Sequence, residues 1–155
     1  MVWKPHVTVA AVVEQDNRFL LVEEHTSNGL RFNQPAGHLE ENEDFYTAVK
    51  REAYEESGWQ FEPEHIVSVQ LWRKKPSKPT FVRVSFSGHC HSHNPQLVLD
   101  EGIVATHWLT RDEIAEKMRE NRLRSPLVLI TVDEYLTGQR YPLSLIKSFL
   151  DTDHV

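Results

Sequence analysis

Cysteine is scarce in this chain of 155 residues, and its 17 lysines and arginines are outnumbered by 23 aspartates and glutamates. Its one cysteine, Cys90, cannot form a disulfide within the chain, which is typical of proteins from a reducing compartment. The formal net charge is −6, so bulk electrostatics would repel polyanions and we expect no nucleic-acid partner. A phosphorylated ligand would therefore need local cations or a bound metal ion to overcome this charge.

Long hydrophobic runs are also missing. The apolar stretch at 7–13 ends at Glu14, which makes it too short to span a membrane, and no clear signal-peptide cleavage site accompanies it. We therefore expect a cytoplasmic protein without membrane contact. The length predicts a single domain over residues 1–155, acting as a monomer or small homo-oligomer.

The order of predicted elements indicates an α/β fold. A central helix from about Phe45 separates two groups of strands, and further helices come late in the chain, which predicts a mixed sheet between helices. Arg83 and Ser85 alternate with apolar residues, so their strand is expected to be half-buried. The predicted strands are 6–13, 18–24 (a hairpin with the first), 30–33, 65–73, 80–91 and 103–109, with a final helix at 142–150.

Two late helices carry start signals. Thr110 and Glu113 form a capping box, and the helix that follows should turn Ile114, Ala115 and Met118 inward. Ser125 is a predicted N-cap with Pro126 at the first helical position.

Glutamates gather on one flank of the central helix, which Asp44 should cap and Gly58 should end. Glu52 and Glu56 are one turn apart, and Glu55 lies three residues from Glu52. Like charges so placed repel, and a solvated acidic helix is the simplest interpretation of any one pair. A hard divalent cation such as Mg²⁺ would replace this repulsion with coordination.

The surrounding residues make the metal-binding interpretation much stronger. At fixed spacing stand Gly37, Glu43, Arg51, Glu52, Ala53, Glu55, Glu56, Gly58 and Trp59. This pattern over residues 37–59 resembles the Nudix box, the signature of hydrolases that cleave a diphosphate linked to another moiety. The small Ala53 and the bulky Trp59 depart mildly from the family pattern, in packing rather than in chemistry.

The resemblance implies a Nudix-type α/β/α sandwich with a mixed central sheet and a Mg²⁺-dependent hydrolase in which Mn²⁺ can substitute. Glu52, Glu55 and Glu56 would be the metal ligands, with a backbone carbonyl of Ala36 or Gly37 added because Gly37 can adopt backbone angles closed to other residues. Arg51 would hold a carboxylate, and Glu43 would be an outer ligand or the partner of Arg51. The general base stays open between Glu52, Glu55 and Glu101.

Flanking stretches carry a further resemblance. HVTVA, NQPAGHLE, LRSPLV and TGQRYPL are similar to the bacterial NudJ phosphatase subgroup of the family. This implies release of inorganic phosphate from nucleoside tri- and diphosphates and from thiamine-type pyrophosphates (HMP-PP and thiamine pyrophosphate). The alternatives are a pyrophosphatase for another nucleoside diphosphate such as ADP-ribose, and a non-catalytic nucleotide sensor.

Substrate contacts are expected just before the helix at Pro126. Arg122, Arg124 and Ser125 lie next to a helix N-terminus, a favourable position for phosphate. Four aromatic residues could stack on a heteroaromatic ring or belong to the core: Tyr46, Trp72, Phe81 and Trp108.

A second cluster, of histidines, is not expected to bind metal. On a strand His89, His91 and His93 point one way and Cys90 points the other, and their spacing matches no standard zinc pattern.

Overall fold

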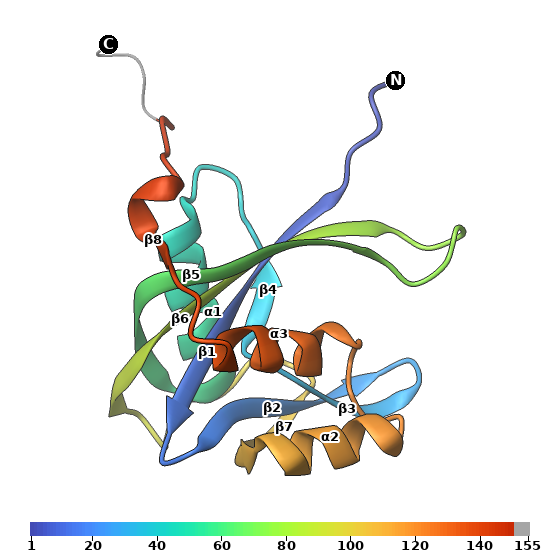
Figure 1. Cartoon of the computed structure of the whole chain (residues 1–155), viewed down its shortest axis with the longest axis vertical. Helices are drawn as coiled ribbons and strands as arrows, with labels where there is room; N and C mark the ends of the chain where they lie inside the picture. The colour runs from blue at the N-terminus through green and yellow to red at the C-terminus, as the bar shows by residue number, and fades with distance from the viewer. Residues whose placement is uncertain (151–155) are drawn as a thin grey trace.

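The computed structural model describes residues 1–150 (Figure 1); the end of the predicted domain, 151–155, lies outside the described residues. The elements in chain order are β1 (His6–Gln15), β2 (Arg18–Thr26), β3 (Gly29–Asn33), β4 (Ala36–His38), α1 (Phe45–Ser57), β5 (Trp59–Arg73), β6 (Thr80–His93), β7 (Ile103–Thr110), α2 (Arg111–Arg119), α3 (Leu127–Leu136), β8 (Tyr141–Pro142) and a 3₁₀ helix at Leu143–Leu145.

Strand β1 is the centre of the sheet. It pairs in parallel with β6 and antiparallel with β4, while β6 pairs with β5 and β5 with β8. Strand β2 instead joins β3 and β7 in an antiparallel group. The predicted hairpin exists only beside its turn, at Glu14–Phe19 and Gln15–Arg18, because β1 and β2 then diverge into these two groups.

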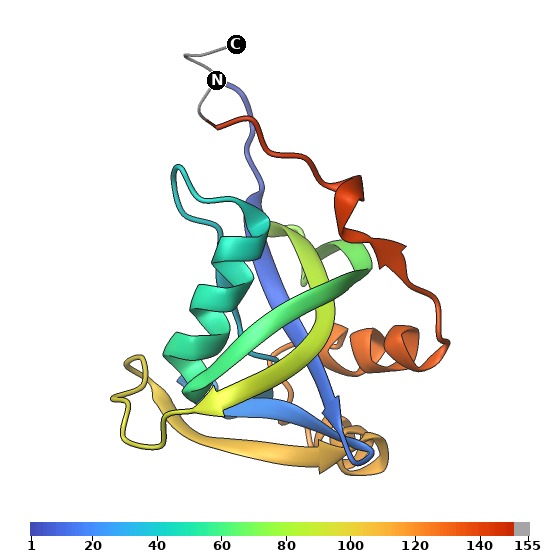
Figure 2. The ribbon, with the colours of Figure 1, turned by 90° about the vertical axis from the view of Figure 1, so that its left-hand side faces the viewer.

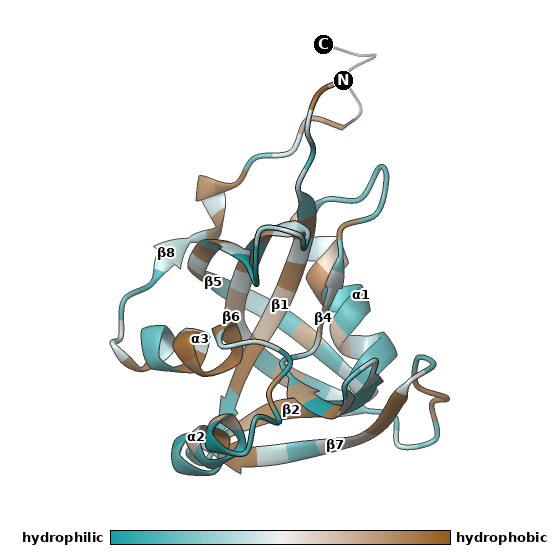
Figure 3. Cartoon of the chain, turned by 90° about the vertical axis from the view of Figure 1, so that its right-hand side faces the viewer, coloured by the Kyte–Doolittle hydropathy of each residue, from teal (hydrophilic) through white to brown (hydrophobic). Residues whose placement is uncertain are grey.

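Helices cover both faces of the strands. Figure 2 shows α1 on one side of β1, β5 and β6, with α2 and α3 on the other. Because side chains alternate along β1, Val9, Ala11 and Val13 pack in the core on the α1 side and Val12 packs in the core on the α3 side. The apolar length of β1 between two helices is visible in Figure 3. The predicted α/β/α sandwich with a mixed sheet is confirmed.

Local capping signals predicted the helix ends well. The Asp44 side chain accepts a hydrogen bond of 2.7 Å from the Thr47 amide, and Gly58 takes the left-handed conformation with φ of 76°. Both hydrogen bonds of the capping box between Thr110 and Glu113 are present. No helix within residues 1–150 is both long and apolar enough to cross a membrane.

Three expectations were wrong, and they concern the final helix and the burial of side chains, which depend on tertiary packing. The final helix does not reach Leu150, since only a 3₁₀ turn forms after Pro142. Met118 is 41% exposed because it lies near the end of α2 at the edge of the cleft described below. Arg83 and Ser85 are buried rather than half-buried, because they face the side of the sheet on which α3 packs against β1 and β5.

The start of α3 agrees with the sequence in its hydrogen bonds. The regular helix begins at Leu127, one residue after the expected Pro126. The Ser125 hydroxyl oxygen nevertheless accepts a hydrogen bond of 3.2 Å from the Leu127 amide, so Ser125 does satisfy an N-terminal donor of this helix.

Candidate active site

Helix α1 turns its apolar stripe into the core and leaves its acidic flank facing β4. Val49 and Ala53 are completely buried, and Tyr46 packs against the same cluster. This orientation leaves Glu52 and Glu56 only 7% and 8% exposed, beside the chain that enters through Ala36–His38. The carboxylates are thus held in a fixed, largely dry environment.

Three carboxylates meet at the end of this flank. One oxygen each from Glu52, Glu55 and Asp100 lies within 4.8 Å of the others. Asp100 comes from the loop before β7, and its amide donates a hydrogen bond of 3.0 Å to the Glu55 carbonyl oxygen, which ties the loop to α1. The neighbouring Glu101, which the sequence suggested as base or ligand, is exposed and outside this group. The acidic pair was visible in the sequence, but not which member faces α1.

Glu56 lies deeper than the other carboxyl groups. Its Oε1 accepts a hydrogen bond of 2.9 Å from the Ala36 amide. Burial raises the pKa of Glu56 to about 9, and the nearby charges of Glu24 and Glu52 add to the effect. Burial likewise raises the pKa of Glu52. Glu52 has Arg51 as a cationic partner, whereas Glu56 forms no ion pair within residues 1–150, and a divalent ion at this position would supply the missing positive charge.

Gly37 is required for space rather than for backbone freedom. Its φ is not among the positive values of the chain, and it pairs regularly with Val9 in the sheet, so the expectation of unusual angles was wrong. A Cβ atom at position 37 would instead lie 2.2 Å from the carboxyl carbon of Glu52. The absence of a side chain lets the Glu52 carboxyl group pack directly on β4.

The pairing of β4 with β1 also shows which of the two candidate backbone carbonyls, Ala36 or Gly37, is free to bind a metal ion. Ala11 donates to the Pro35 oxygen and Leu39 to the Val7 oxygen, so Gly37 occupies the intervening hydrogen-bonded pair with β1. The amide of Ala36 therefore points away from β1, as its bond to Glu56 shows. In an extended strand the carbonyl of a residue points to the same side as its N–H group, which favours Ala36 over Gly37 as a backbone ligand.

Arg51 joins the carboxylates into one network. Its guanidinium donates to both oxygens of Glu43 at 2.7 and 3.0 Å. Its Nη1 also donates to Glu52 at 2.8 Å and to Glu55 at 3.1 Å. The hydrogen bonds from Arg51 lower the pKa of Glu43, and those to Glu43 raise the pKa of Arg51. Of its two suggested roles, Glu43 has the geometry of the arginine's partner.

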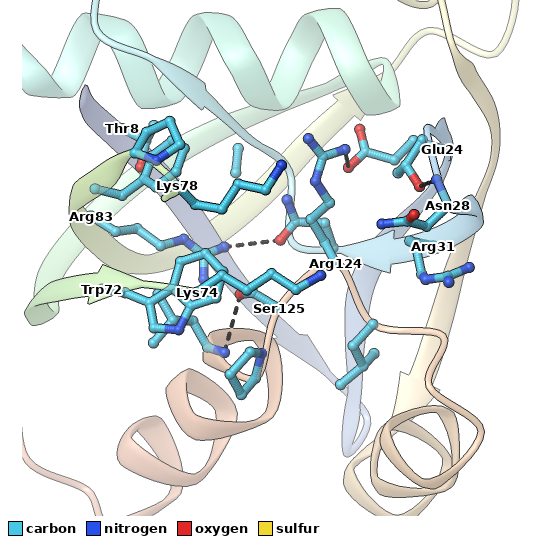
Figure 4. A pocket seen from close by; sticks show the side chains of 18 of the residues that line it. Thr8, Glu24, Asn28, Arg31, Trp72, Lys74, Lys78, Arg83, Arg124 and Ser125 are labelled. Atoms are coloured by element: carbon cyan, nitrogen blue, oxygen red, sulfur yellow. Dashed lines mark hydrogen bonds and ion pairs between the residues drawn. The ribbon is translucent and has the colours of Figure 1, made fainter. Parts of the chain in front are cut away.

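A cleft of about 1180 Å³ opens beside this network (Figure 4). Ala36 and Gly37 line one side of it, so the cleft reaches the backbone that touches Glu52 and Glu56. The β5–β6 hairpin, the β2–β3 hairpin and the N-terminal end of α3 form its other walls. The side of the cleft formed by Ala36 and Gly37 adjoins the acidic flank of α1.

The cleft contains part of the predicted phosphate contact. Arg124 and Ser125 line it, with Arg124 paired to Glu24 at 3.2 Å. Arg122 does not line it, because its guanidinium bonds Glu23 at 3.0 Å and lies over the Phe32 ring.

The cleft walls are cationic and aromatic. Five cationic residues line the cleft against a single acidic one, Glu24: these are Arg31, Lys74, Lys78, Arg83 and Arg124. This local excess was not found in the sequence, because the residues come from four separate segments. Trp72 and Phe81 line the cleft, whereas Tyr46 and Trp108 pack against the core under α1.

The histidine cluster lies on a different part of the sheet. His89 contacts Glu64, His91 contacts Glu62, and His93 stacks on Trp59. Cys90 is half-buried, and burial raises its pKa to about 12.

Comparison with known proteins settles which family has this arrangement. The NUDIX domain matches residues 4–128. The chain belongs to the Nudix family. It is 40% identical over 147 residues, covering 95% of this chain and 94% of the relative, to proteins called Phosphatase NudJ from Shigella boydii and Escherichia coli K12. The resemblance seen in the box and its flanking stretches is thereby confirmed, and the chain is a hydrolase of phosphorus-containing acid anhydrides.

Solved structures agree with this assignment. A NUDIX hydrolase from Nitrosomonas europaea superposes with a TM-score of 0.91 at 42% identity, covering 96% of this chain and 99% of that one. An ADP-ribose pyrophosphatase from Streptococcus suis gives a TM-score of 0.57 at 19% identity, over 70% of this chain and 76% of its own, and shares the fold alone. Nudix enzymes act on small-molecule diphosphates, which fits a cleft rich in cations.

Proposed function

We propose that this Nudix enzyme is a Mg²⁺-dependent phosphatase that releases inorganic phosphate from nucleoside tri- and diphosphates and from thiamine-type pyrophosphates, HMP-PP and thiamine pyrophosphate. The observation that carries the proposal is that a cluster of carboxylates at α1 lies beside a cleft lined by cationic residues, in a protein whose net charge is negative. The name of the relatives, Phosphatase NudJ, favours phosphate rather than pyrophosphate as the product.

The donor set suits a hard divalent cation. Glu52, Glu55, Asp100 and Glu56 would hold it, with the Ala36 carbonyl as a backbone ligand. Neither cysteine nor histidine belongs to this carboxylate group, so Mg²⁺ or Mn²⁺ fits better than zinc. When bound, such an ion neutralises phosphate charge and lowers the pKa of water.

The protein's own groups position that chemistry. Arg51 keeps Glu52 and Glu55 at fixed places through its hydrogen bonds, and Glu43 fixes Arg51 in turn. A general base must lie within hydrogen-bonding reach of the attacking water. The Glu55 side chain, 39% exposed compared with 10% for Glu52, is the better placed of the two to meet solvent, and we assign it this role.

The cleft orients the rest of the substrate. The phosphate chain would extend from the carboxylates past Gly37, within reach of Arg124 and the hydroxyl of Ser125. Trp72 and Phe81 offer apolar surface to a heteroaromatic ring at the same cleft. We propose that the enzyme works in the cytoplasm, as a monomer or small homo-oligomer on small molecules, in keeping with the free thiol of Cys90.

Turnover of a nucleoside triphosphate with and without Mg²⁺ tests the proposal. We expect phosphate release only with Mg²⁺ or Mn²⁺, and a loss of roughly 10²-fold or more in Glu52→Gln, because one electrostatic contact to the reacting phosphate is removed. Nucleotide binding by the wild type without any turnover would instead indicate the non-catalytic sensor. Preferred cleavage of ADP-ribose would indicate the alternative pyrophosphatase.

A further inference from the structure

Arg83 is a buried cation on the floor of the cleft. It is 6% exposed and lines the cleft from β6, where it lies opposite Thr8 of β1. Its neighbour Val84 belongs to the core under α1, so Arg83 faces the opposite side of the sheet, toward α3. Figure 4 shows its side chain reaching into the cleft from the sheet.

One end of the guanidinium group is fixed and the other has no partner. Nη2 donates to the amide oxygens of Gln34 at 2.9 Å and Asn33 at 3.1 Å. Gln34 is itself held by a bond from its Nε2 to the Val128 oxygen. Nη1 is buried and has no hydrogen-bond partner among residues 1–150. A buried nitrogen of this kind is costly unless an acceptor reaches it.

The charge of Arg83 is uncompensated as well. Within the described residues no carboxylate forms an ion pair with it, and its two partners are neutral amides. Burial lowers the pKa of Arg83 to about 10, which leaves it charged at neutral pH. Lys74 and Lys78, which line the same cleft, form no ion pair within residues 1–150 either. The unpaired positive charge of these three residues therefore favours an anionic ligand in this part of the cleft.

The position of Arg83 relates it to the reacting end of the substrate. Asn33 and Gln34, which fix the guanidinium, are separated only by Pro35 from the segment of Ala36 and Gly37 that touches the carboxylates of α1. We propose that Nη1 of Arg83 binds a phosphate oxygen of the substrate, on the phosphoryl group next to the one held at the α1 carboxylates. This inference rests on the proposed function, because it takes the ligand to be a phosphoanhydride.

Arg83 would then select substrates with two adjacent phosphates. A charge-assisted hydrogen bond from a desolvated guanidinium is among the stronger contacts available to a phosphate. A monophosphate that occupies only the carboxylate end would not reach Nη1, whereas a diphosphate would reach both.

Calorimetry with inorganic pyrophosphate in metal-free buffer tests the assignment without turnover. We expect Arg83→Gln to weaken pyrophosphate binding tenfold or more and Arg83→Lys to recover only part of it, since lysine lacks the forked donor group. Lys75→Gln, which removes an exposed cation of the same β5–β6 turn outside the cleft lining, is the matched control and should change affinity less than threefold. Equal affinity of Arg83→Gln and wild type, in metal-free buffer or with Mg²⁺ added, or no binding by wild type under either condition, overturns the inference.

A measurement on the wild type covers the case in which Arg83→Gln fails to fold. The guanidinium ¹⁵N signals of Arg83, assigned as those missing from Arg83→Lys, should shift on titration with pyrophosphate and not with an uncharged nucleoside. A shift with the nucleoside alone would assign Arg83 to the organic part of the substrate and contradict the inference. Pyrophosphate binding through Arg83 without phosphate release from nucleotides would contradict only the proposed function.

Discussion

The carboxyl group of Glu52 fills the space in which a side chain at position 37 would stand. A Cβ atom there would lie 2.2 Å from the carboxyl carbon and from Oε1 of Glu52. The same carboxyl group accepts a hydrogen bond of 2.8 Å from Arg51. A helix and a strand that are separated in the chain thus fix one metal-ligand candidate between them.

Gly37→Ala should therefore displace Glu52 without straining the backbone. We expect kcat to fall at least tenfold and the Mg²⁺ concentration for half-maximal activity to rise, because the carboxylate leaves its place beside Arg51. Steady-state kinetics over a range of Mg²⁺ concentrations measure both effects. In the metal-free protein, Glu52→Ala should relieve the clash, so the double variant should unfold at a higher temperature than Gly37→Ala alone. Wild-type kinetics in Gly37→Ala would show that the close contact has no functional role.

Asp100 and Glu101 offer a matched pair of tests. Asp100→Asn removes one negative charge from the cluster that Asp100 forms with Glu52 and Glu55. Mg²⁺ affinity and kcat should therefore both fall, by about tenfold or more. Glu101→Gln alters an exposed neighbour outside the group and should behave like the wild type. Magnesium-dependent kinetics on the two variants decide the matter. The reverse ranking would restore Glu101 as the functional carboxylate.

The raised pKa of Glu56 predicts a pH dependence in the metal-free protein. Since the folded pKa of about 9 exceeds the unfolded value, the native state binds more protons between about pH 4.5 and 9, and stability falls as pH rises through this window. The glutamine side chain in Glu56→Gln does not ionise, so this variant should lose the pH dependence of stability that comes from Glu56. We expect its melting temperature to match the wild type at pH 5 and to exceed it by on the order of 5 °C at pH 8.

Thermal unfolding at both pH values with a metal chelator present measures this difference. A gap between the two proteins that stays constant with pH would contradict the burial of Glu56 as an acid. With saturating Mg²⁺ at pH 8 the order should reverse, because only the wild type offers the fourth carboxylate to the cation.

Arg124 and Arg122 are two residues apart but should differ in effect. Arg124 lines the cleft, so Arg124→Ala should raise KM for a nucleoside diphosphate several-fold with a smaller change in kcat. Arg122 points to Glu23 and Phe32 outside the cleft, so Arg122→Ala should alter stability more than KM. Equal KM values for the two variants would show that the cleft is not where the phosphates bind.

The sequence predicted those features of the fold that depend on contacts between residues close together in the chain. The caps at Asp44, Gly58 and Thr110 depend on contacts within a few positions, and all three form as expected. The arrangement of Glu52 and Glu55 on one flank follows from helical spacing in the same way.

What the sequence could not predict depends on contacts between distant segments. Asp100 rather than Glu101 faces α1 because its amide bonds the Glu55 carbonyl across 45 positions. The alternation around Arg83 predicted a half-buried strand, but Arg83 is buried because it faces the side of the sheet on which α3 packs. Gly37 was expected to serve through its backbone angles, whereas it serves by leaving space for Glu52, which only the packed structure shows.

The product formed first from a nucleoside triphosphate tests the central claim most directly. With Mg²⁺ present, separate assays for inorganic phosphate and pyrophosphate, together with chromatography of the nucleotides, should show phosphate and nucleoside diphosphate rising from the start. Thiamine pyrophosphate should yield phosphate and thiamine monophosphate under the same conditions. Pyrophosphate and nucleoside monophosphate as the only first products, or turnover that persists when all divalent metal is removed, would contradict the account.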